Sequence, residues 1–322
     1  KSWLRPKELE KWDMLGLCAR GNISRGMQSV KRRLNSINNS FDESDCFEKD
    51  TLYILRDTET MDTVIELNDV SLTRGETEIL REVSWHTSRQ EQWVVLGANG
   101  AGKTSLVRVA SGKVAPSSGQ ACFDGVPLES CQPQELAARC SLVSLSTTQR
   151  LRPSTRVIDV VRSAAWGVSS PFGEEYEDID TARARDLLAL FSVAHLEDRP
   201  FHTLSEGERQ RIVLARGLMS DPEALILDEP AAGLDLGARE LLVAAMAEII
   251  SGRAAPQLLL VTHHLEEIPQ GITHALVMKA GEVFASGPVE EVLTGRVLSE
   301  AFELALSVEN DNGRWLARGL PR

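Results

Sequence analysis

The chain has 322 residues, of which 47 are acidic and 35 are basic, so its formal charge is −12. This length is enough for one large domain or two modest ones with a substantial core. Apolar residues make up 42 % and charged residues 25 %, an ordinary globular composition that argues against wholesale disorder. The acidic balance disfavours a protein whose main task is to bind nucleic-acid phosphates, so we expect no nucleic-acid partner.

The sequence predicts neither a membrane-spanning helix nor a secretory signal. No stretch approaches the roughly 18 consecutive apolar residues that a membrane-spanning helix needs. Residues 1–11 are dense in charge and lack the apolar core of a signal peptide. The five cysteines are odd in number and form no CxxC pair, which disfavours a disulfide framework or a zinc site. We therefore expect a soluble protein of the reducing cytoplasm.

Residues 1–60 differ in composition from the rest of the chain. Up to Asn35 they carry nine Lys or Arg against three Asp or Glu, and an Asn/Ser stretch and an acidic run follow. Neither helical nor strand periodicity persists across them. Two interpretations stay open: an extension that docks on another molecule, or a disordered or non-native upstream sequence with Met61 as the natural start. The second is favoured.

From Met61 onward the pattern predicts a mixed α/β domain. Two short β-rich runs, 64–67 and 79–85, come first. Compact apolar runs typical of central strands follow at 92–96, 142–145, 224–227, 257–262 and 275–278. Between them, stretches such as 181–191 and 209–219 have apolar residues at helical spacing. Alternating strands and helices predict a mostly parallel sheet covered on both faces.

A glycine-rich segment after the run 92–96 fits the phosphate-binding pattern GxxxxGK[ST]. Its residues are Gly97, Ala98, Asn99, Gly100, Ala101, Gly102, Lys103 and Thr104, and Ser105 follows them. Glycines let the backbone curl until several N–H groups point at one phosphate chain, and the helix that begins near Lys103 directs its positive end at the same anion. Lys103 supplies a mobile charge, and the Thr104 hydroxyl is placed to ligate Mg²⁺. The alternative is a strand–helix turn without a ligand, which the Lys-Thr pair disfavours.

The apolar run 224–227 ends in two carboxylates, Asp228 and Glu229. Asp228 is placed to hold Mg²⁺, directly or through water, and Glu229 to polarise an attacking water beside the γ-phosphate. Two solvated acids that cap a strand are the alternative for such a pair taken alone. Its position about 125 residues after Lys103 favours the functional interpretation.

With these motifs in place, residues 61–322 resemble an ATP-binding cassette (ABC) ATPase subunit, and the resemblance covers about four fifths of the chain. The segment 204–211 is similar to the LSGGQ signature of that family: Ser205 and Gly207 match it, and Glu208 gives an LSxGE form similar to importer-type subunits. Ser205 and the Gly207 N–H, at the start of a helix, form a second anion-binding helix end. In the family this end closes on the γ-phosphate held by a partner subunit. The resemblance therefore implies two ATP molecules between head-to-tail protomers, with Ser205, Gly207 and Glu208 as nucleotide contacts.

Two later segments complete the resemblance. Asp235 ends a segment similar to the D-loop and is a further expected nucleotide contact. His263 follows the strand 258–261, at the place of the family's switch histidine, which contacts the γ-phosphate and helps to hold the water and Glu229. The neighbouring His264 is an alternative for this position, and a satisfied strand-end histidine is the alternative for a lone His. The resemblance implies ATP hydrolysis with Glu229 and His263 as catalytic residues.

The resemblance also implies the architecture, the cofactors and the partners. The fold class is α/β: an ABC-type P-loop NTPase with a mixed, largely parallel sheet core, an N-terminal antiparallel β-subdomain and an α-helical subdomain at roughly 149–220. ATP and Mg²⁺ are the expected cofactors, with Thr104, Asp228 and Gln149 near the metal. The expected partners are a second copy or a paired ABC subunit and integral membrane permease chains. Such a subunit would lie peripherally on the cytoplasmic face of the cell membrane.

Two family contacts are irregular in this chain. The family usually stacks adenine on an aromatic residue near the position of Arg74, where this chain has none. Either the Arg74 guanidinium lies on the base, or Arg74 is an exposed turn residue. Gln149 has the spacing of the Q-loop glutamine from Lys103, but it follows its strand later than the family pattern expects. A metal-linked glutamine and a surface loop glutamine both stay open.

Three functions compete at this stage. The leading hypothesis is an energy-coupling ATPase of a membrane transporter whose permease chains are separate. The alternative is a soluble ATP-driven clamp of the same superfamily. The long heptad inserts of repair clamps are missing here, so a role such as cluster assembly is the form of this alternative that stays open. A third is a degenerate cassette that binds ATP as a structural switch without turnover. Glu229 and His263 argue against the third.

Overall fold

The computed structural model describes residues 62–166 and 176–320, so the predicted N-terminal extension, 1–60, lies outside the described residues. Residues 62–166, 176–251 and 256–320 belong to one compact unit. Within the described ranges, no helix combines the length and apolarity needed to cross a bilayer.

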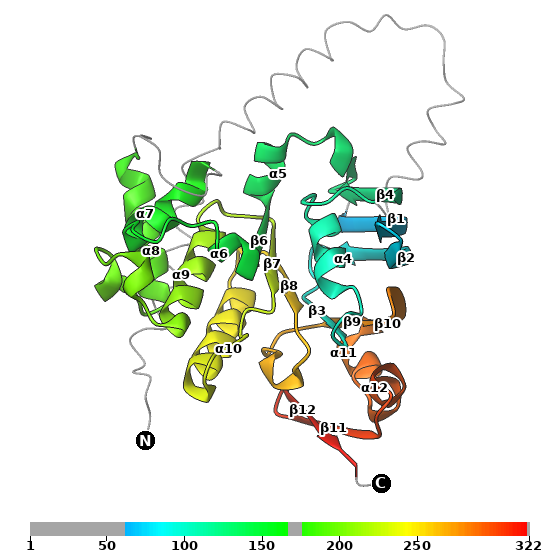
Figure 1. Cartoon of the computed structure of the whole chain (residues 1–322). Helices are drawn as coiled ribbons and strands as arrows, with labels where there is room; N and C mark the ends of the chain where they lie inside the picture. The colour runs from blue at the N-terminus through cyan, green and yellow to red at the C-terminus, as the bar shows by residue number, and fades with distance from the viewer. Residues whose placement is uncertain (1–61, 167–175, 321–322) are drawn as a thin grey trace, which may run out of the picture. The chain divides into compact units, whose positions relative to one another are not determined.

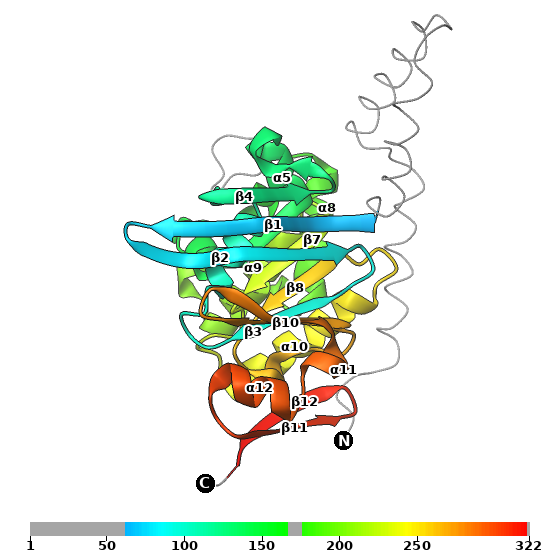
Figure 2. The same cartoon turned by 90° about the vertical axis from the view of Figure 1, so that its right-hand side faces the viewer.

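A four-stranded antiparallel sheet opens the unit, as the sequence predicts. Its order is β2-β1-β4-β5. The strands are β1 (Thr63–Arg74), β2 (Thr77–Ser88), β4 (Ser118–Phe123) and β5 (Val126–Pro127). The β1–β2 hairpin is longer than the two predicted runs because bulges reset its alternation: Asp69 and Glu82 have φ of 48° and 44°, and the register shifts beside them. The sheet covers one side of the parallel sheet (Figure 2).

The six-stranded sheet is parallel except at one edge, and its order is β10-β9-β3-β8-β7-β6. The strands are β3 (Trp93–Gly97), β6 (Cys140–Ser144), β7 (Ala224–Asp228), β8 (Gln257–Val261), β9 (His274–Lys279) and β10 (Glu282–Pro288). Every residue of β3, β7 and β8 is buried, as expected for apolar strands with both faces covered. The predicted parallel core is confirmed. Each predicted apolar run overlaps one strand of this sheet, and its bounds lie within three residues of the bounds of that strand.

Alternate residues of β3 enter two separate cores. Val94 and Leu96 pack with the large helices, whereas Trp93 and Val95 pack with the antiparallel sheet and α4 (Lys103–Ala110). The other helices are α5 (Pro133–Arg139), α6 (Leu145–Thr148), α7 (Val157–Arg162), α8 (Asp178–Leu190), α9 (Glu206–Leu218), α10 (Leu236–Ser251), α11 (Val289–Val292) and α12 (Gly295–Phe302). Figure 1 shows α4 on the side of the antiparallel sheet and α7 to α10 on the other side.

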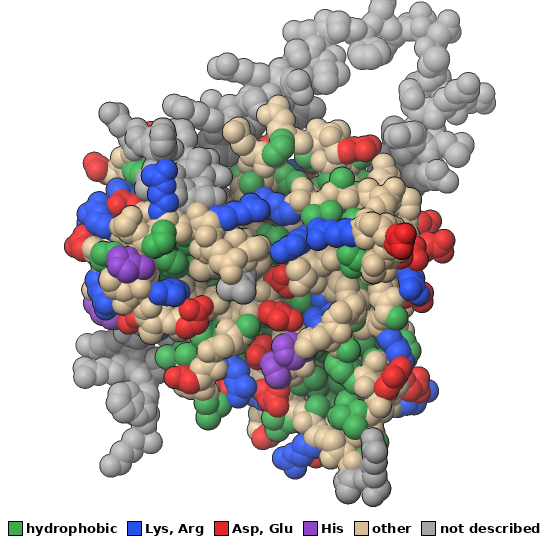
Figure 3. Space-filling model, viewed as in Figure 1, with side chains coloured by type: hydrophobic (Ala, Val, Ile, Leu, Met, Phe, Trp, Pro, Cys, Tyr) green, Lys and Arg blue, Asp and Glu red, His purple; other side chains and the backbone are tan. Residues whose placement is uncertain are grey.

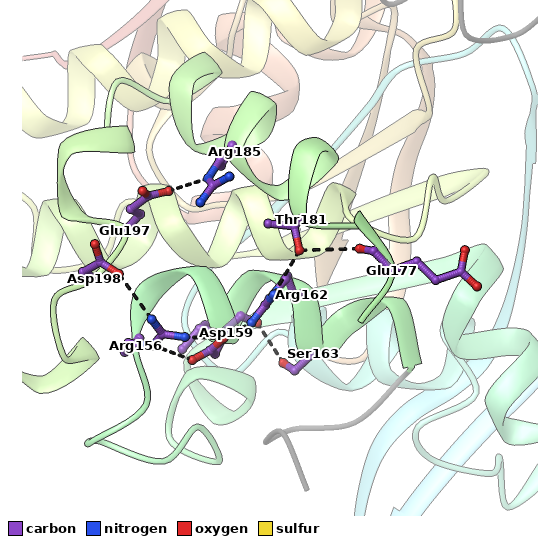
Figure 4. A network of polar contacts seen from close by, with 10 residues as sticks. Arg156, Asp159, Arg162, Ser163, Glu177, Thr181, Arg185, Glu197 and Asp198 are labelled. Atoms are coloured by element: carbon purple, nitrogen blue, oxygen red, sulfur yellow. Dashed lines mark hydrogen bonds and ion pairs between the residues drawn. The ribbon is translucent and has the colours of Figure 1, made fainter. Parts of the chain in front are cut away.

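Helices α7, α8 and α9 pack on one another within the range expected for a helical subdomain. Asp159 of α7 pairs with Arg156 and Arg162, and Arg162 Nη1 donates to Thr181 Oγ1 of α8 at 3.0 Å (Figure 4). The Asp159 pairs are local to α7, and the part-buried Arg162–Thr181 bond connects α7 to α8. The limits of the subdomain, 149–220, stay a prediction.

A short hairpin ends the described chain. It consists of β11 (Leu306–Asp311) and β12 (Arg314–Gly319), which pair antiparallel. Its strand β12 contacts the 3₁₀ turn η8 (Leu265–Glu267), which follows β8. Trp315 buries its side chain in the core of the large helices. The hairpin is thereby fixed against the segment that carries the predicted switch histidine.

Candidate active site

The glycine-rich segment links the buried strand β3 to α4, as predicted. Gly97 has φ 154°, and a Cβ on it would lie 2.5 Å from Met278 O of β9. Gly102 has φ 101° and caps α4, and a Cβ there would lie 3.0 Å from Ile79 O of β2. A side chain at Gly97 would collide with the backbone of β9, and one at Gly102 would crowd β2 in a backbone conformation that favours glycine. The loop therefore curls tightly between the two sheets, with the first N–H groups of α4 directed into it.

Lys103 is almost fully buried within this loop. Its Nζ donates to Gly97 O at 2.8 Å and to Ala98 O at 3.1 Å. Burial lowers the pKa of Lys103, and the negative charges of Glu229 and Asp228 oppose that shift. The ammonium group thus lies between the loop and two carboxylates, where the oxygens of a phosphate chain would complete its partners.

Thr104 and Asp228 form the oxygen-rich part of the site. Thr104 Oγ1 donates to Asp228 Oδ1 at 3.1 Å, and Asp228 is only 9 % exposed. Burial raises the pKa of Asp228, while the bond from Thr104 and the charges of Arg108 and Lys103 act in the other direction. Hydroxyl and carboxylate oxygens are the donors that Mg²⁺ prefers, and Mg²⁺ is commonly held by one or two carboxylates together with substrate phosphates. The pair therefore fits that ion. Ser105 is half-buried on the first turn of α4.

Glu229 follows Asp228 in a left-handed backbone conformation. Its φ is 51°, and its N–H donates to Val261 O at 3.0 Å. A non-glycine residue in this region costs on the order of 1–3 kcal/mol and persists only where the surroundings enforce it. The turn directs the half-exposed Glu229 carboxylate toward His263, whose Nδ1 lies 3.4 Å from Glu229 Oε1.

A buried polar contact shapes the turn that carries His263. Thr262 Oγ1 donates to Glu267 Oε2 at 2.5 Å, and the same hydroxyl oxygen accepts the N–H of His264 at 3.0 Å. Thr262 and Glu267 are both buried. The rings of His263 and His264 lie 4.1 Å apart, centroid to centroid, and the nitrogen placed beside Glu229 belongs to His263. The geometry therefore favours His263 over His264 as the partner of Glu229.

A hollow of about 250 Å³ lies between this turn and the start of α10. Its lining is formed by Glu229, Ala231, Ala232, Gly233, Leu234, Arg239, His263, His264 and Glu267. Acidic and histidine side chains gather on this part of the surface, over the segment that follows β8 (Figure 3). The hollow adjoins the Glu229–His263 pair and is wide enough for several waters.

The segment similar to the signature begins α9 with a reciprocal cap. Glu208 Oε2 accepts the Ser205 N–H at 2.8 Å and the Ser205 hydroxyl at 2.9 Å, and Ser205 Oγ in turn accepts the Glu208 N–H at 3.4 Å. The bond from the Ser205 backbone N–H is the main reason that the pKa of Glu208 is lowered. This capping box is the physical role of the glutamate in the LSxGE form.

Asp235 caps the adjacent helix in a similar way. Its Oδ1 accepts the N–H of Ala238 at 2.8 Å, at the start of α10. A Cβ on Gly207 would lie 3.0 Å from the Cβ of Ala238, so the two helix starts are in contact. Ser205, Gly207, Glu208 and Asp235 therefore share one surface. Among the described residues, the polar contacts of Ser205, Glu208 and Asp235 do not reach the phosphate-binding loop.

The structure places the two irregular residues at exposed positions. Gln149 lies one residue beyond α6, and Arg74 lies at the end of β1, opposite Thr77. The residue in register with Asp228 on the neighbouring strand is Ser144. Its hydroxyl lies 2.8 Å from Ser146 Oγ and 3.1 Å from Thr147 Oγ1. Sequence reasoning missed this hydroxyl cluster, although the run Ser-Leu-Ser-Thr that begins at the last residue of β6 was a visible signal. The roles of Gln149 and Arg74 stay predictions.

Comparison with known proteins identifies the family of this chain. A family model described as ABC transporter matches residues 80–232. The uncharacterized ABC transporter ATP-binding protein YlmA of Bacillus subtilis is 37 % identical over 264 residues, which are 80 % of this chain and 98 % of that protein. The hemin import ATP-binding protein HmuV of Nocardia farcinica is 32 % identical over 230 residues, which are 71 % of this chain and 77 % of that protein.

Solved structures show the same fold. An ATP-binding cassette of an ABC transporter in its ADP conformation aligns with a TM-score of 0.64 at 22 % identity, covering 75 % of this chain and 97 % of that one. A dimeric bacterial ABC transporter cassette aligns with a TM-score of 0.61 at 20 % identity, covering 70 % and 98 %. The fold, the order of the motifs and the sequence relatives agree, and the chain belongs to the family of ABC transporter ATP-binding proteins.

Proposed function

We propose that this chain is the ATP-hydrolysing subunit of an ABC transporter. The observation that carries the proposal is the assembly of five predicted residues at one end of the parallel sheet. Lys103 lies within the loop, Thr104 is bonded to Asp228, and Glu229 faces His263. The order of strands β3, β8 and β7 brings them together from segments up to 160 residues apart.

In this proposal the loop residues 97–104 and Ser105 bind the phosphates of ATP. Backbone N–H groups and the end of α4 contact the phosphate oxygens, and Lys103 exchanges its bonds to the loop carbonyls for bonds to the β- and γ-phosphates. Thr104 and Asp228 would hold Mg²⁺, with Gln149 as a further candidate ligand. When bound, the ion supplies positive charge that neutralises the phosphate oxygens.

Glu229 and His263 would act on the attacking water. A carboxylate that is half-exposed and directed at the γ-phosphate side accepts a proton from water as the water attacks. His263 would orient that carboxylate and the water through its ring nitrogen, which lies 3.4 Å from Glu229 Oε1. Arg74 would lie on the adenine.

The surface of Ser205, Gly207, Glu208 and Asp235 would complete the site of a second subunit. These residues lie together, and within the part of the chain that the structure describes the polar contacts of Ser205, Glu208 and Asp235 do not reach the phosphate-binding loop, which supports a head-to-tail arrangement. The dimeric form of one structural neighbour is consistent with such a pair. ATP binding would close the dimer, and hydrolysis would reopen it.

The transporter partner would be separate permease chains. The relative from Nocardia farcinica is a hemin import ATP-binding protein, and we propose the corresponding coupling role here without assigning a solute. The helical segment 149–220 would receive the permease and pass on the movement of the dimer. The subunit would then lie on the cytoplasmic face of the membrane.

The deciding experiment uses Glu229→Gln, with Glu290→Gln on the exposed face of α11 as the matched control. Glu229→Gln should keep ATP affinity, lose at least about a hundredfold in turnover, as expected for loss of a general base, and accumulate as an ATP-bound dimer. Light scattering, equilibrium ATP binding and phosphate release measure these three quantities. Unchanged turnover in Glu229→Gln would remove the assigned role.

The wild-type protein also separates the competing functions. Recovery from membranes together with integral membrane chains supports the transporter, whereas co-purification with soluble scaffold proteins alone supports a cluster-assembly role. Wild-type protein that binds ATP but releases no phosphate would be a degenerate cassette.

A further inference from the structure

The C-terminal hairpin contacts residues that are next in sequence to both walls of the hollow beside Glu229 and His263. Its Arg314 side chain reaches α10 and the turn η8 at once: Nη1 and Nη2 donate to the two carboxylate oxygens of Glu240 at 2.8 and 3.0 Å, and Nη2 also donates to Glu266 O at 2.9 Å. A planar guanidinium fork is the only side-chain group that makes this set of bonds.

Glu240 and Glu266, the two residues that Arg314 contacts, are each next in sequence to a residue that lines the hollow. Glu240 follows Arg239, and Glu266 precedes Glu267. Glu267 is also the acceptor for Thr262, whose hydroxyl fixes the N–H after His263. Arg314 therefore lies one residue behind each wall of the hollow, and through Glu267 it is connected to the turn that sets the position of His263.

Other contacts hold the hairpin in place, so the backbone that carries Arg314 is fixed. Leu306 N donates to Ser299 Oγ of α12 at 2.9 Å, and Gln270 Nε2 donates to Asn312 O at 2.5 Å. Trp315, the next residue, is 8 % exposed. The bond from Arg314 lowers the pKa of Glu240, which favours the charged carboxylate that the guanidinium contacts.

We propose that Arg314 is a positioning residue: it joins the turn at residues 262–267, which carries His263, to α10 and thereby keeps His263 beside Glu229. The proposal rests on the proposed function, because it assigns the hairpin to the hydrolytic step. Arg314 touches neither the phosphate-binding loop nor the residues expected to bind the nucleotide in the described structure. It acts on turnover through the turn and leaves ATP binding to other residues.

The test compares Arg314→Ala with Arg318→Ala, which removes an exposed arginine from the same strand. Arg314→Ala should lower kcat about tenfold, in the range that small displacements of catalytic groups cost, and change KM for ATP less than about twofold. Hydrogen exchange should accelerate in the peptide that spans 263–268, and Arg318→Ala should match the wild type in both measurements.

Two conservative variants keep the test decisive if Arg314→Ala folds poorly. Arg314→Lys keeps the charge and loses the fork, and Glu240→Gln keeps the volume and loses the charge, so both should lie between wild type and Arg314→Ala in kcat and in exchange. Thermal unfolding of each variant separates a displaced turn from a loosened hairpin.

The outcomes for the inference and for the proposed function are distinguishable. Faster exchange of 263–268 with an unchanged kcat, or equal losses in Arg314→Ala and Arg318→Ala, overturns the positioning role and leaves the ATPase intact. A rise in KM that matches the fall in kcat/KM also overturns it. Absence of phosphate release from the wild type overturns the proposed function, and with it the assignment of Arg314 to hydrolysis.

Discussion

Thr104 and Asp228 are bonded at 3.1 Å although 124 residues separate them in the sequence. The bond is possible because β8 lies between β3 and β7, and α4 packs against both β3 and β7. The parallel strands end at the same edge, so the first turn of α4 meets the residue that ends β7. The two oxygens proposed for the metal are therefore positioned by the sheet order itself.

Asp228→Asn should separate metal binding from nucleotide binding. The amide keeps a bond with Thr104 but loses the negative charge, so Mg²⁺ affinity in the presence of ATP should fall at least about tenfold, while binding of metal-free ATP is kept. Calorimetric titration with and without Mg²⁺ measures both, with Asp186→Asn on the exposed face of α8 as the control. Burial raises the pKa of Asp228. As the pH is lowered, this carboxylate should therefore become protonated, and the Mg²⁺ affinity of the wild type should weaken, at a higher pH than for an ordinary aspartate. An affinity independent of Asp228 would contradict the assignment.

Lys103→Ala should act on nucleotide binding itself. A buried ammonium–phosphate contact is worth about 1.5–3 kcal/mol, so ATP affinity should fall about 10- to 150-fold. Fluorescence titration with a labelled ATP measures this change. Lys113→Ala removes an exposed lysine just beyond α4 and should leave the affinity unchanged. Normal ATP affinity in Lys103→Ala would remove Lys103 from the phosphate contacts.

Glu208→Gln should reveal the capping box through the pH dependence of stability. The folded-state pKa of Glu208 is lowered, so its contribution is fully present above the unfolded value, about 4.3, and disappears as the pH falls through the folded value. The difference in Tm between wild type and Glu208→Gln should therefore be largest near pH 7 and shrink toward pH 3.

Two variants complete this test of the cap. Ser205→Ala should cost about 1 kcal/mol at neutral pH, the usual cost of losing an N-cap hydroxyl. Glu206→Gln alters the neighbouring glutamate, which has no bond to Ser205, and should not reproduce the pH-dependent part. A difference for Glu208→Gln that stays constant from pH 7 to pH 3 would show that the carboxylate charge does not support the cap.

Arg74 tests how the base is held. If its guanidinium lies on adenine, Arg74→Ala should raise KM for ATP about 2- to 30-fold, which corresponds to a cation–π contact of about 0.5–2 kcal/mol. Arg74→Tyr should restore most of the affinity by aromatic stacking. Equal KM values for wild type and Arg74→Ala would identify Arg74 as an exposed turn residue.

Local patterns were sufficient to predict the parallel core and the strand ends at which the candidate site residues lie. The strand β3, the glycine-rich loop and α4 follow one another without interruption, and β7 ends in its two carboxylates, so each element carries its own signal. Their meeting in space follows from the parallel arrangement. The predicted helices 181–191 and 209–219 appear as α8 and α9, shifted by one to three residues toward the N-terminus, because their caps at Glu177 and Ser205 precede the apolar pattern.

Other features depend on contacts that no local pattern contains. The first predicted strand stops at Leu67 because the bulge at Asp69 breaks the alternation, although the strand continues to Arg74. The contacts of Arg314 with Glu240 and Glu266 join residues 74 and 48 positions apart. Such pairings are set by how the C-terminal hairpin packs, so the sequence alone gave no reason to single out Arg314.

The cap at the start of α9 also has a consequence for closure of the proposed dimer. The Glu208 carboxylate already accepts the Ser205 amide and hydroxyl, which are donors that an incoming phosphate would use. In the proposed dimer, the Glu208 carboxylate and the phosphate would compete for one helix end, and the phosphate would have to displace the carboxylate before the second subunit could bind. Binding of the second subunit would therefore begin when the Ser205 donors exchange the Glu208 carboxylate for a phosphate oxygen. A stronger Glu208 contact would then favour the separated subunits over the closed dimer.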